Sequence, residues 1–190
     1  ERLAKLKPVF DKPWGNITAG NSSQVSDGAA LLLLASEEAV KKWNLHPLGR
    51  ILDTQWAGLD PAYMGLGPVH AATPILQRNN LSLNDLDLWE INEAFAAQVL
   101  GCLSAWNDEA YCQTQLGTPA WGQLDTARLN VDGGAIALGH PVGASGARIV
   151  LHLLHALRGR GLRRGMASIC IGGGQGGAML VETLPLEHAQ

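Results

Sequence analysis

Two glycine-rich loops each carry a side chain that can move a proton. The first, residues 133–146, contains His140 followed by Pro141, and the second, residues 170–177, opens with Cys170. Glycine lets backbone amides approach a reacting atom closely, and the fixed φ of proline stiffens the chain beside the imidazole. An imidazole and a thiol in such loops favour acid–base or nucleophilic catalysis.

Other interpretations of these loops have to be weighed. A glycine-rich loop before a helix can hold a phosphate, but neither loop contains Gly-x-x-x-x-Gly-Lys. The spacing of Gly139, Gly143 and Gly146 also differs from the dinucleotide fingerprint. Cys170 alone would equally well be an inert buried thiol, and His140 alone an ordinary loop histidine. Catalysis is favoured because the two occur together.

The third candidate side chain is the amide of Asn92. It stands between an alternating apolar segment, residues 86–91, and a segment of helical composition, residues 92–100. An asparagine at a strand-to-helix junction is often only a helix N-cap. Beside a histidine loop and a cysteine loop, the amide could instead orient a water or a carbonyl group.

The segments beside the two loops are predicted to form regular elements. After Gly146, apolar residues recur at three- and four-residue spacing up to Leu157, which predicts an amphipathic helix. Short apolar runs at residues 166–169 and 178–181 predict a strand pair joined by the second loop. His140 is therefore expected at a loop-to-helix junction and Cys170 at a strand end.

The rest of the chain is predicted to alternate in the same way. The apolar run at residues 29–35 predicts a strand covered on both faces, and a helix capped by Ser36 follows it. Residues 50–56 predict a strand, residues 69–78 a helix, and residues 106–124 an irregular surface connection.

The motifs resemble the C-terminal signatures of the thiolases, the acyl-CoA C-acyltransferases. Three segments carry this resemblance: residues 92–96, 133–148 and 170–176. Residues 15–30 and 64–68 match two further family segments upstream, so the resemblance covers essentially the whole chain. The related condensing ketoacyl synthases use a different His–Thr loop and lack the Cys-Ile-Gly-Gly-Gly end.

The resemblance implies an α/β fold, layered α/β/α, with a mixed five-stranded sheet in the C-terminal domain. Residues 1–49 would be the final strand and helix of the thiolase N-terminal domain, and residues 50–190 the C-terminal domain. Thiolases carry their nucleophilic cysteine in an N-terminal half, and Cys102 and Cys112 match no nucleophile motif. The chain is therefore expected to be a fragment that is inactive and poorly stable alone.

The resemblance also assigns catalytic roles. His140 would act as base to the missing nucleophilic cysteine, and Cys170 would move the proton at the α-carbon of acetyl-CoA. Asn92 would hold a water that stabilises the enolate oxygen together with His140. The backbone N–H of Gly172 would contact the thioester oxygen.

Four further residues resemble substrate-binding positions of the family. Ala19 and Ser23 correspond to positions near the pantetheine arm, and Met64 and Phe95 to walls of the acyl pocket. Ser23 could equally be a turn or cap residue, and Met64 or Phe95 simple core.

The implied activity is reversible thiolysis of 3-ketoacyl-CoA to acetyl-CoA and a shortened acyl-CoA, or Claisen condensation of two acetyl-CoA. Coenzyme A would be a substrate, and no cofactor is implied. The implied partners are acyl-CoA, the missing N-terminal half and further copies in a homodimer or homotetramer. A non-catalytic thiolase-derived domain that binds acyl-CoA or a protein partner is the alternative.

Composition narrows the class of protein. The chain has 190 residues and a net charge of −3, which argues against binding to nucleic acid or a membrane surface. Three cysteines without Cys-x-x-Cys suggest a reducing compartment and no zinc site, and no apolar run reaches transmembrane length. A cytoplasmic location is expected. His152 and His155 are more readily helix-face residues than metal ligands.

Overall fold

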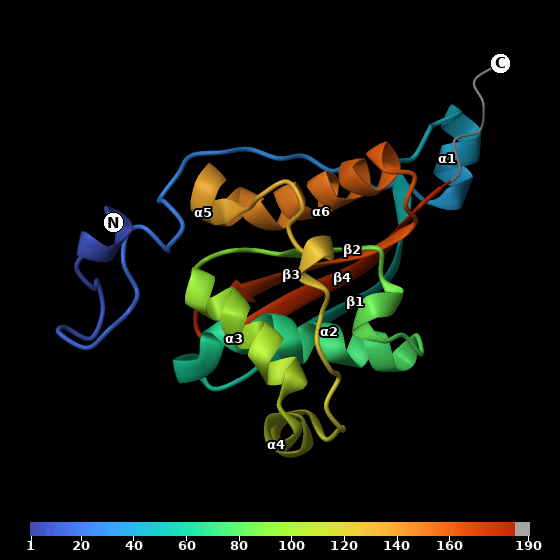
Figure 1. Ribbon diagram of the computed structural model, residues 1–190. Coiled ribbons are helices and arrows are strands. Elements are labelled where there is room, and N and C mark those ends of the chain that lie inside the picture. Colours follow the sequence, from blue (N-terminus) through green and yellow to red (C-terminus); the bar gives the residue numbers. More distant parts are fainter. Residues whose placement is uncertain (185–190) are drawn as a thin grey trace.

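The computed structural model describes residues 1–184. A mixed sheet lies between helix α6 on one face and helices α2 and α3 on the other, while the N-terminal segment runs along the outside (Figure 1). The elements in chain order are α1 (Glu37–Trp43), β1 (Gly49–Gly58), α2 (Gly67–Arg78), β2 (Leu88–Ile91), α3 (Ala96–Asn107), α4 (Glu109–Tyr111), α5 (Ala135–Leu138), α6 (Val142–Gly159), β3 (Arg164–Ile171) and β4 (Gln175–Thr183).

Within residues 1–184 the sheet has four strands in the order β1-β4-β3-β2, rather than the expected five. β3 and β4 form the predicted antiparallel pair, β1 pairs antiparallel with β4, and β2 runs parallel to β3. The α/β class and the mixed sheet are confirmed. Because β2 and β3 are parallel, their C-terminal ends lie at the same edge of the sheet.

The sheet face toward α2 and α3 carries the larger core. Trp89 of β2 and Trp106 of α3 meet edge to face, with ring centroids 5.4 Å apart. Both indole N–H groups donate to buried partners, Trp89 to the carbonyl of Leu83 at 2.9 Å and Trp106 to the hydroxyl of Thr73 at 3.0 Å. Aromatic pairs with satisfied polar ends hold the surrounding elements in one arrangement.

The opposite face packs against α6. Leu153 and Leu157 of the helix are fully buried against Leu88, Ala167 and Val181 of the sheet. Burying each leucine contributes about 1.5–3 kcal/mol. The predicted amphipathic helix is confirmed, although it begins earlier than expected, at Val142, with Pro141 at its N-cap.

Two junctions differ from the sequence expectation. α3 begins at Ala96 and has Phe95 at its N-cap, so Asn92 is not a helix cap. The amide of Asn92 is therefore free of the capping role that its position suggested. The second junction is the start of α2, which begins at Gly67 and contains Pro74 in its interior.

The strand predicted at residues 29–35 is wrong. This stretch has no regular secondary structure, and Leu31, Leu33 and Leu34 are 84%, 80% and 73% exposed. A strand requires a hydrogen-bonded neighbour, and no strand within residues 1–184 pairs with this stretch. The helix after it is confirmed, since the Ser36 hydroxyl accepts a hydrogen bond from the N–H of Ala39 at 3.2 Å.

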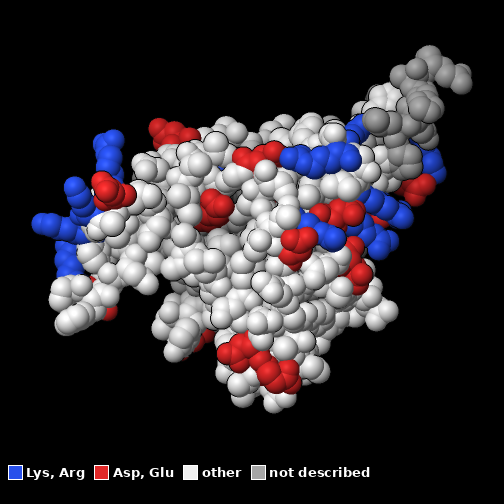
Figure 2. All heavy atoms as spheres, in the orientation of Figure 1, with Lys and Arg blue, Asp and Glu red and all other residues white. Residues whose placement is uncertain are grey.

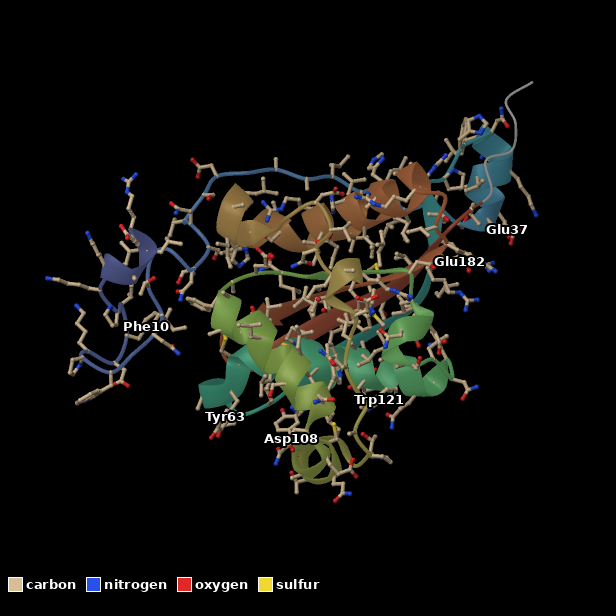
Figure 3. All side chains as sticks on the ribbon, in the orientation of Figure 1. Phe10, Glu37, Tyr63, Asp108, Trp121 and Glu182 are labelled. Atoms are coloured by element: carbon tan, nitrogen blue, oxygen red, sulfur yellow. The ribbon has the colours of Figure 1, made fainter. Side chains whose placement is uncertain are left out.

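The connection at residues 106–124 is more ordered than predicted. It contains the end of α3, the short helix α4 and a π-helical turn at Cys112–Leu116. Cys112 is buried and its thiol donates to the carbonyl of Ala105 at 3.2 Å, so it is a core residue. Figure 3 labels Asp108, near the start of this region in the chain, and Trp121, near its end.

Charged residues gather at one end of the sheet. Glu182, near the end of β4, accepts hydrogen bonds from Arg50, Arg163 and Arg164 (Figure 3). In Figure 2, Lys and Arg side chains gather there and also over the N-terminal segment at the left, while the surface over α2 and α3 is largely uncharged. This basic end lies at the opposite end of β4 from the loop that follows Cys170.

Candidate active site

Asn92 and Cys170 are brought together by the parallel pairing of β2 and β3. Ile91, the last residue of β2, is opposite Ser168. The N–H of Asn92 continues the ladder by donating to the carbonyl of Ser168 at 2.9 Å. Asn92 therefore lies beside β3 just before Cys170.

His140 reaches the same sheet edge from the first glycine-rich loop. Gly139 has φ +91°, a conformation that L side chains rarely adopt, and turns the chain before the histidine. The His140 N–H donates to the carbonyl of Gln24 at 3.0 Å, and Arg148 donates to the carbonyl of Gly139 at 2.9 Å. These contacts place His140 Nε2 3.4 Å from Asn92 Nδ2.

The contacts around the imidazole fit the tautomer that carries its hydrogen on Nδ1. The Ser145 hydroxyl donates its only proton to the carbonyl of Pro141, at 3.1 Å. Its oxygen is 2.6 Å from His140 Nδ1 and then accepts a hydrogen bond from the N–H at that position. In this arrangement Nδ1 carries the hydrogen, and the lone pair of Nε2 faces the Nδ2 of Asn92. An imidazole in this tautomer can act as a base at Nε2.

The pKa values of the two proton-handling groups move apart. Burial, and then the positive charge of Arg148, lower the pKa of His140. Burial raises the pKa of Cys170 to about 11, with the residue only 5% exposed. At neutral pH the site therefore holds a neutral imidazole that can accept a proton and a thiol that can donate one.

Asn92 has one polar atom left for another molecule. Its Oδ1 is buried and has no hydrogen-bond partner among the described residues. An unmet buried acceptor of this kind costs free energy, and a donor from a water or a ligand would remove that cost. This observation supports, without testing, the prediction that Asn92 holds a water.

The loop after Cys170 has a backbone that requires glycine. Gly173 and Gly174 have φ +86° and +83°. A Cβ at Gly174 would also lie 2.2 Å from the carbonyl oxygen of Leu59. Gly172 is exposed in this turn, between β3 and β4. Its predicted contact with a thioester oxygen stays a prediction.

The predicted substrate-binding residues come from three segments of the chain: residues 19–23, the loop after Asn92 and a short helix before α2. Both the N–H and the hydroxyl of Ser23 donate to the carbonyl of Ala94, at 2.9 and 3.0 Å, so Ser23 links the N-terminal segment to the loop after Asn92. Phe95 stacks edge to face on Phe10, at 6.2 Å between ring centroids; Figure 3 shows Phe10 in the outer N-terminal segment.

Of the hydrogen bonds within residues 1–184, none joins the other two binding candidates to His140 or Asn92. Ala19 is exposed in the N-terminal segment. Met64 is half-buried in a short 3-10 helix, Pro61–Leu66, which packs against α3 through a bond from the Cys102 thiol to the carbonyl of Gly65, at 3.3 Å. The substrate-binding roles of Ala19, Ser23, Met64 and Phe95 stay predictions.

Sequence reasoning missed three side chains at this site: Ser145, Arg148 and Glu93. The first two lie within one or two helical turns after His140. The sequence signal for Ser145 was a polar side chain on the otherwise apolar helix face that continues through Ile149 and Leu153, and Arg148 lies outside that face. Glu93 follows Asn92 directly and offered no comparable signal.

A buried carboxyl group lies behind the site. Glu90 is 4% exposed on β2, and its Oε1 is 2.8 Å from Nδ1 of His152, whose Nε2 lies 3.2 Å from Asp132. Among residues 1–184 no three His, Cys, Asp or Glu side chains form a cluster able to hold a metal ion. Both ring nitrogens of His152 thus contact carboxyl groups, those of Glu90 and Asp132. His155 is exposed.

Glu90 is expected to make stability fall as pH rises. Burial raises its pKa from 4.5 to about 7, so the folded chain keeps a proton that the unfolded chain has lost between these values. The free energy of unfolding then decreases by about 3 kcal/mol as pH passes from below 4.5 to above 7. Glu90→Gln removes this titration. Its stability relative to wild type, from denaturant unfolding at each pH, should increase with pH, and a constant difference would contradict the assignment.

Comparison with known proteins identifies the family. The family described as "Thiolase, C-terminal domain" matches residues 45–183, nearly three quarters of the chain. The chain belongs to the thiolase family. The description "Thiolase, N-terminal domain" matches residues 1–38.

Two named relatives agree with the thiolase assignment. The mitochondrial 3-ketoacyl-CoA thiolase of Bos taurus is 50% identical over 182 residues, covering 96% of this chain and 42% of the relative. An acetyl-CoA acetyltransferase of Escherichia coli (strain K12) is 48% identical over 184 residues, covering 97% of this chain and 42% of the relative. The thiolase chain described here therefore spans less than half the length of these relatives.

Solved structures agree as well. The crystal structure of human mitochondrial 3-ketoacyl-CoA thiolase in complex with CoA matches with a TM-score of 0.79 and 45% identity, covering 97% of this chain and 42% of that one. The Bacillus anthracis acetyl-CoA acetyltransferase matches with a TM-score of 0.82 and 46% identity, covering 96% and 42%.

The expected cytoplasmic location is contradicted. The related thiolases of Bos taurus and Homo sapiens are mitochondrial enzymes by name. The expectation rested on composition and cysteine pattern, neither of which specifies a cellular compartment. Of the helices within residues 1–184, none is long and apolar enough to cross a membrane.

Proposed function

We propose that the complete protein is an acyl-CoA C-acyltransferase that cleaves 3-ketoacyl-CoA with coenzyme A and also runs in reverse. The observation that carries this proposal is the Asn92–His140 contact at the sheet edge where β3 delivers Cys170. The imidazole and the amide are in contact, and the strand paired with β2 ends at the thiol, so a base, an amide and an acid are offered at one edge of the sheet. The names and folds of the relatives support the same chemistry.

In the proposed first step, His140 Nε2 takes the proton of a nucleophilic cysteine supplied by the rest of the protein. The resulting thiolate attacks the 3-keto carbonyl carbon, and the bond between the α- and β-carbons breaks. The acyl group stays on the cysteine, and acetyl-CoA leaves as its enolate. The protonated His140 and a water held by Asn92 stabilise the enolate oxygen.

In the next step Cys170 gives its proton to the α-carbon of the enolate. The raised pKa of Cys170 suits this role, because the thiol rather than the thiolate is present at neutral pH. The thiolate left on Cys170 then takes the proton of the incoming coenzyme A, whose sulfur attacks the acyl-enzyme. The nucleophilic cysteine recovers its proton from His140, which completes the cycle. Gly172 N–H would stabilise the thioester oxyanion.

The proposed partners follow from the same comparison. Coenzyme A and its acyl thioesters would be substrates rather than cofactors, in keeping with the CoA complex of the human relative. The missing N-terminal half would supply the nucleophile and cover the exposed leucines of residues 31–34. Pairing with a second copy, as a homodimer or homotetramer, completes the proposal.

An assay of acetoacetyl-CoA thiolysis tests this function. The complete protein should consume acetoacetyl-CoA when coenzyme A is added, and residues 1–190 alone should not. Cys102, Cys112 and Cys170 are all buried in residues 1–184; Cys102 and Cys112 match no nucleophile motif, and Cys170 is proposed as the acid and base, so the acyl carrier has to come from the rest of the protein.

Residues 1–190 alone are also expected to have a low melting temperature, because the exposed leucines leave apolar surface in water. Robust turnover by this segment would contradict the proposal. Binding of coenzyme A by the complete protein without turnover would instead favour the non-catalytic alternative.

A further inference from the structure

Glu93 joins two loops at the candidate active site. Its Oε1 accepts a hydrogen bond from Asn130 Nδ2 at 3.0 Å, and its Oε2 accepts one from the N–H of Ile136 at 3.2 Å. Glu93 is half-buried and follows Asn92 directly in the chain. Its carboxylate therefore lies between the segment that carries Asn92 and the segment that leads to His140.

Asn130 anchors one end of the histidine loop to β2. Its side-chain amide pairs with both backbone groups of Ile91, each at 2.9 Å, and its N–H donates to the carbonyl of Trp89 at 2.9 Å. Asn130 also has φ +46°, a conformation that asparagine adopts more readily than most residues. The start of the loop is fixed to the strand that positions Asn92.

The other end of the loop leads directly to His140. Ile136 lies in α5, and its N–H is one of the first amides of that helix, which have no partner within it. The N–H of Gly139 donates to the carbonyl of Ala135 at 2.8 Å, and His140 follows. Only Gly139 separates the end of α5 from His140, and its N–H is bonded back to α5. A displacement of α5 would therefore also displace the imidazole.

Gly134 shows how closely the loop packs on this carboxylate. A Cβ at this position would lie 2.4 Å from Glu93 Cδ and 2.6 Å from its Oε2. The backbone of Gly134 is extended, with φ −147° and ψ −159°, a region open to any residue. Glycine is needed here for the contact with Glu93 and not for its conformational freedom.

We propose that Glu93 is a positioning residue that holds the loop carrying His140 at the separation from Asn92 that the reaction requires. This inference rests on the proposed function. Glu93 acts through Asn130 and α5, and no hydrogen bond within residues 1–184 joins it to the imidazole. A misplacement of about 1 Å at a catalytic group can cost about 10²-fold in rate, so this link bears directly on turnover.

The test compares variants of the complete protein in thiolysis of acetoacetyl-CoA. Glu93→Ala removes both acceptors and should lower kcat by about 10²-fold, with KM changed by less than about threefold. Glu93→Gln keeps an acceptor for the Ile136 N–H without a titratable group. It should stay within about tenfold of wild type and keep the shape of the pH profile. Asn84→Ala is the matched control, because Asn84 also bridges loop backbone groups, Gln123 and Asp125, away from the site.

Gly134→Ala supplies an independent variant. Alone it should lower kcat, because its Cβ displaces the carboxylate. In the Glu93→Ala background it should have little further effect, because the atoms it would strike are gone. Additive losses would show that the two residues do not act through one contact and would overturn the proposal.

Three other results would also overturn it. Wild-type kcat in Glu93→Ala, or an equal loss in Asn84→Ala, would remove the positioning role. Loss of one limb of the pH profile in Glu93→Gln would make Glu93 an acid or base instead.

Crystal structures of the complete protein with each Glu93 substitution test the inference independently of the proposed function. If wild type itself does not turn over, the proposed function fails, and Glu93 is judged on geometry alone. The Asn92 Nδ2–His140 Nε2 separation of 3.4 Å should lengthen in Glu93→Ala and be kept in Glu93→Gln. An unchanged separation in Glu93→Ala would refute the inference without reference to activity.

Discussion

Cys170→Ala in the complete enzyme is expected to slow exchange of the α-protons of acetyl-CoA by about 10²–10⁴-fold, the usual contribution of a general acid or base. Acylation of the nucleophilic cysteine should continue at an appreciable rate, because His140 and not Cys170 is proposed to activate that cysteine. Exchange is measured by the loss of the acetyl proton signal in D₂O, and acylation by mass spectrometry of the enzyme after a short incubation.

Cys112→Ala is the matched control for this experiment. Cys112 is also buried, but its thiol donates to the carbonyls of Ala105 and Trp106 in the core away from the sheet edge. This variant should lose stability without a selective loss of exchange. A Cys170→Ala enzyme that exchanges protons at the wild-type rate would remove Cys170 from the proposed mechanism.

His140→Ala is expected to impair both halves of the reaction. The imidazole is proposed to activate the nucleophile and also to stabilise the enolate oxygen, so acylation and α-proton exchange should each fall by about 10²–10⁴-fold. The same two assays measure these losses. His155→Ala is the control, because His155 is an exposed histidine on the same helix as Ser145.

Two results would contradict the separate roles proposed for His140 and Cys170. Equal and small effects of His140→Ala and Cys170→Ala on both steps would contradict the assignment of separate roles. A loss of exchange in His140→Ala with normal acylation would leave His140 at the enolate and require another base for the nucleophile.

The sequence predicted the candidate catalytic side chains because short motifs carry them. His140 and Cys170 stand out by their glycine neighbours, and the strand that ends before Asn92 shows regular alternation. The capping alternative for Asn92 could only be removed by the structure, because the start of a helix within a run of helix-forming residues has no sharp signal. α3 begins four residues after Asn92, at Ala96.

Long-range contacts were not predictable from the sequence. Glu93 meets Asn130 across 37 positions of the chain, and neither residue type announces such a contact. The strand predicted at residues 29–35 failed for a related reason. An apolar run shows that a segment favours burial, but the partner that would pair with it lies elsewhere, and residues 1–184 do not provide one.

The central claim is that His140, Asn92 and Cys170 act on one acetyl group. A crystal structure of the complete enzyme with acetyl-CoA tests it most directly. The thioester oxygen should lie within hydrogen-bond distance of His140 Nε2 and of a water held by Asn92, with the methyl carbon about 3.5 Å from Cys170 Sγ. An acetyl group bound away from this sheet edge, or His140 and Cys170 directed at different surfaces, would contradict the claim.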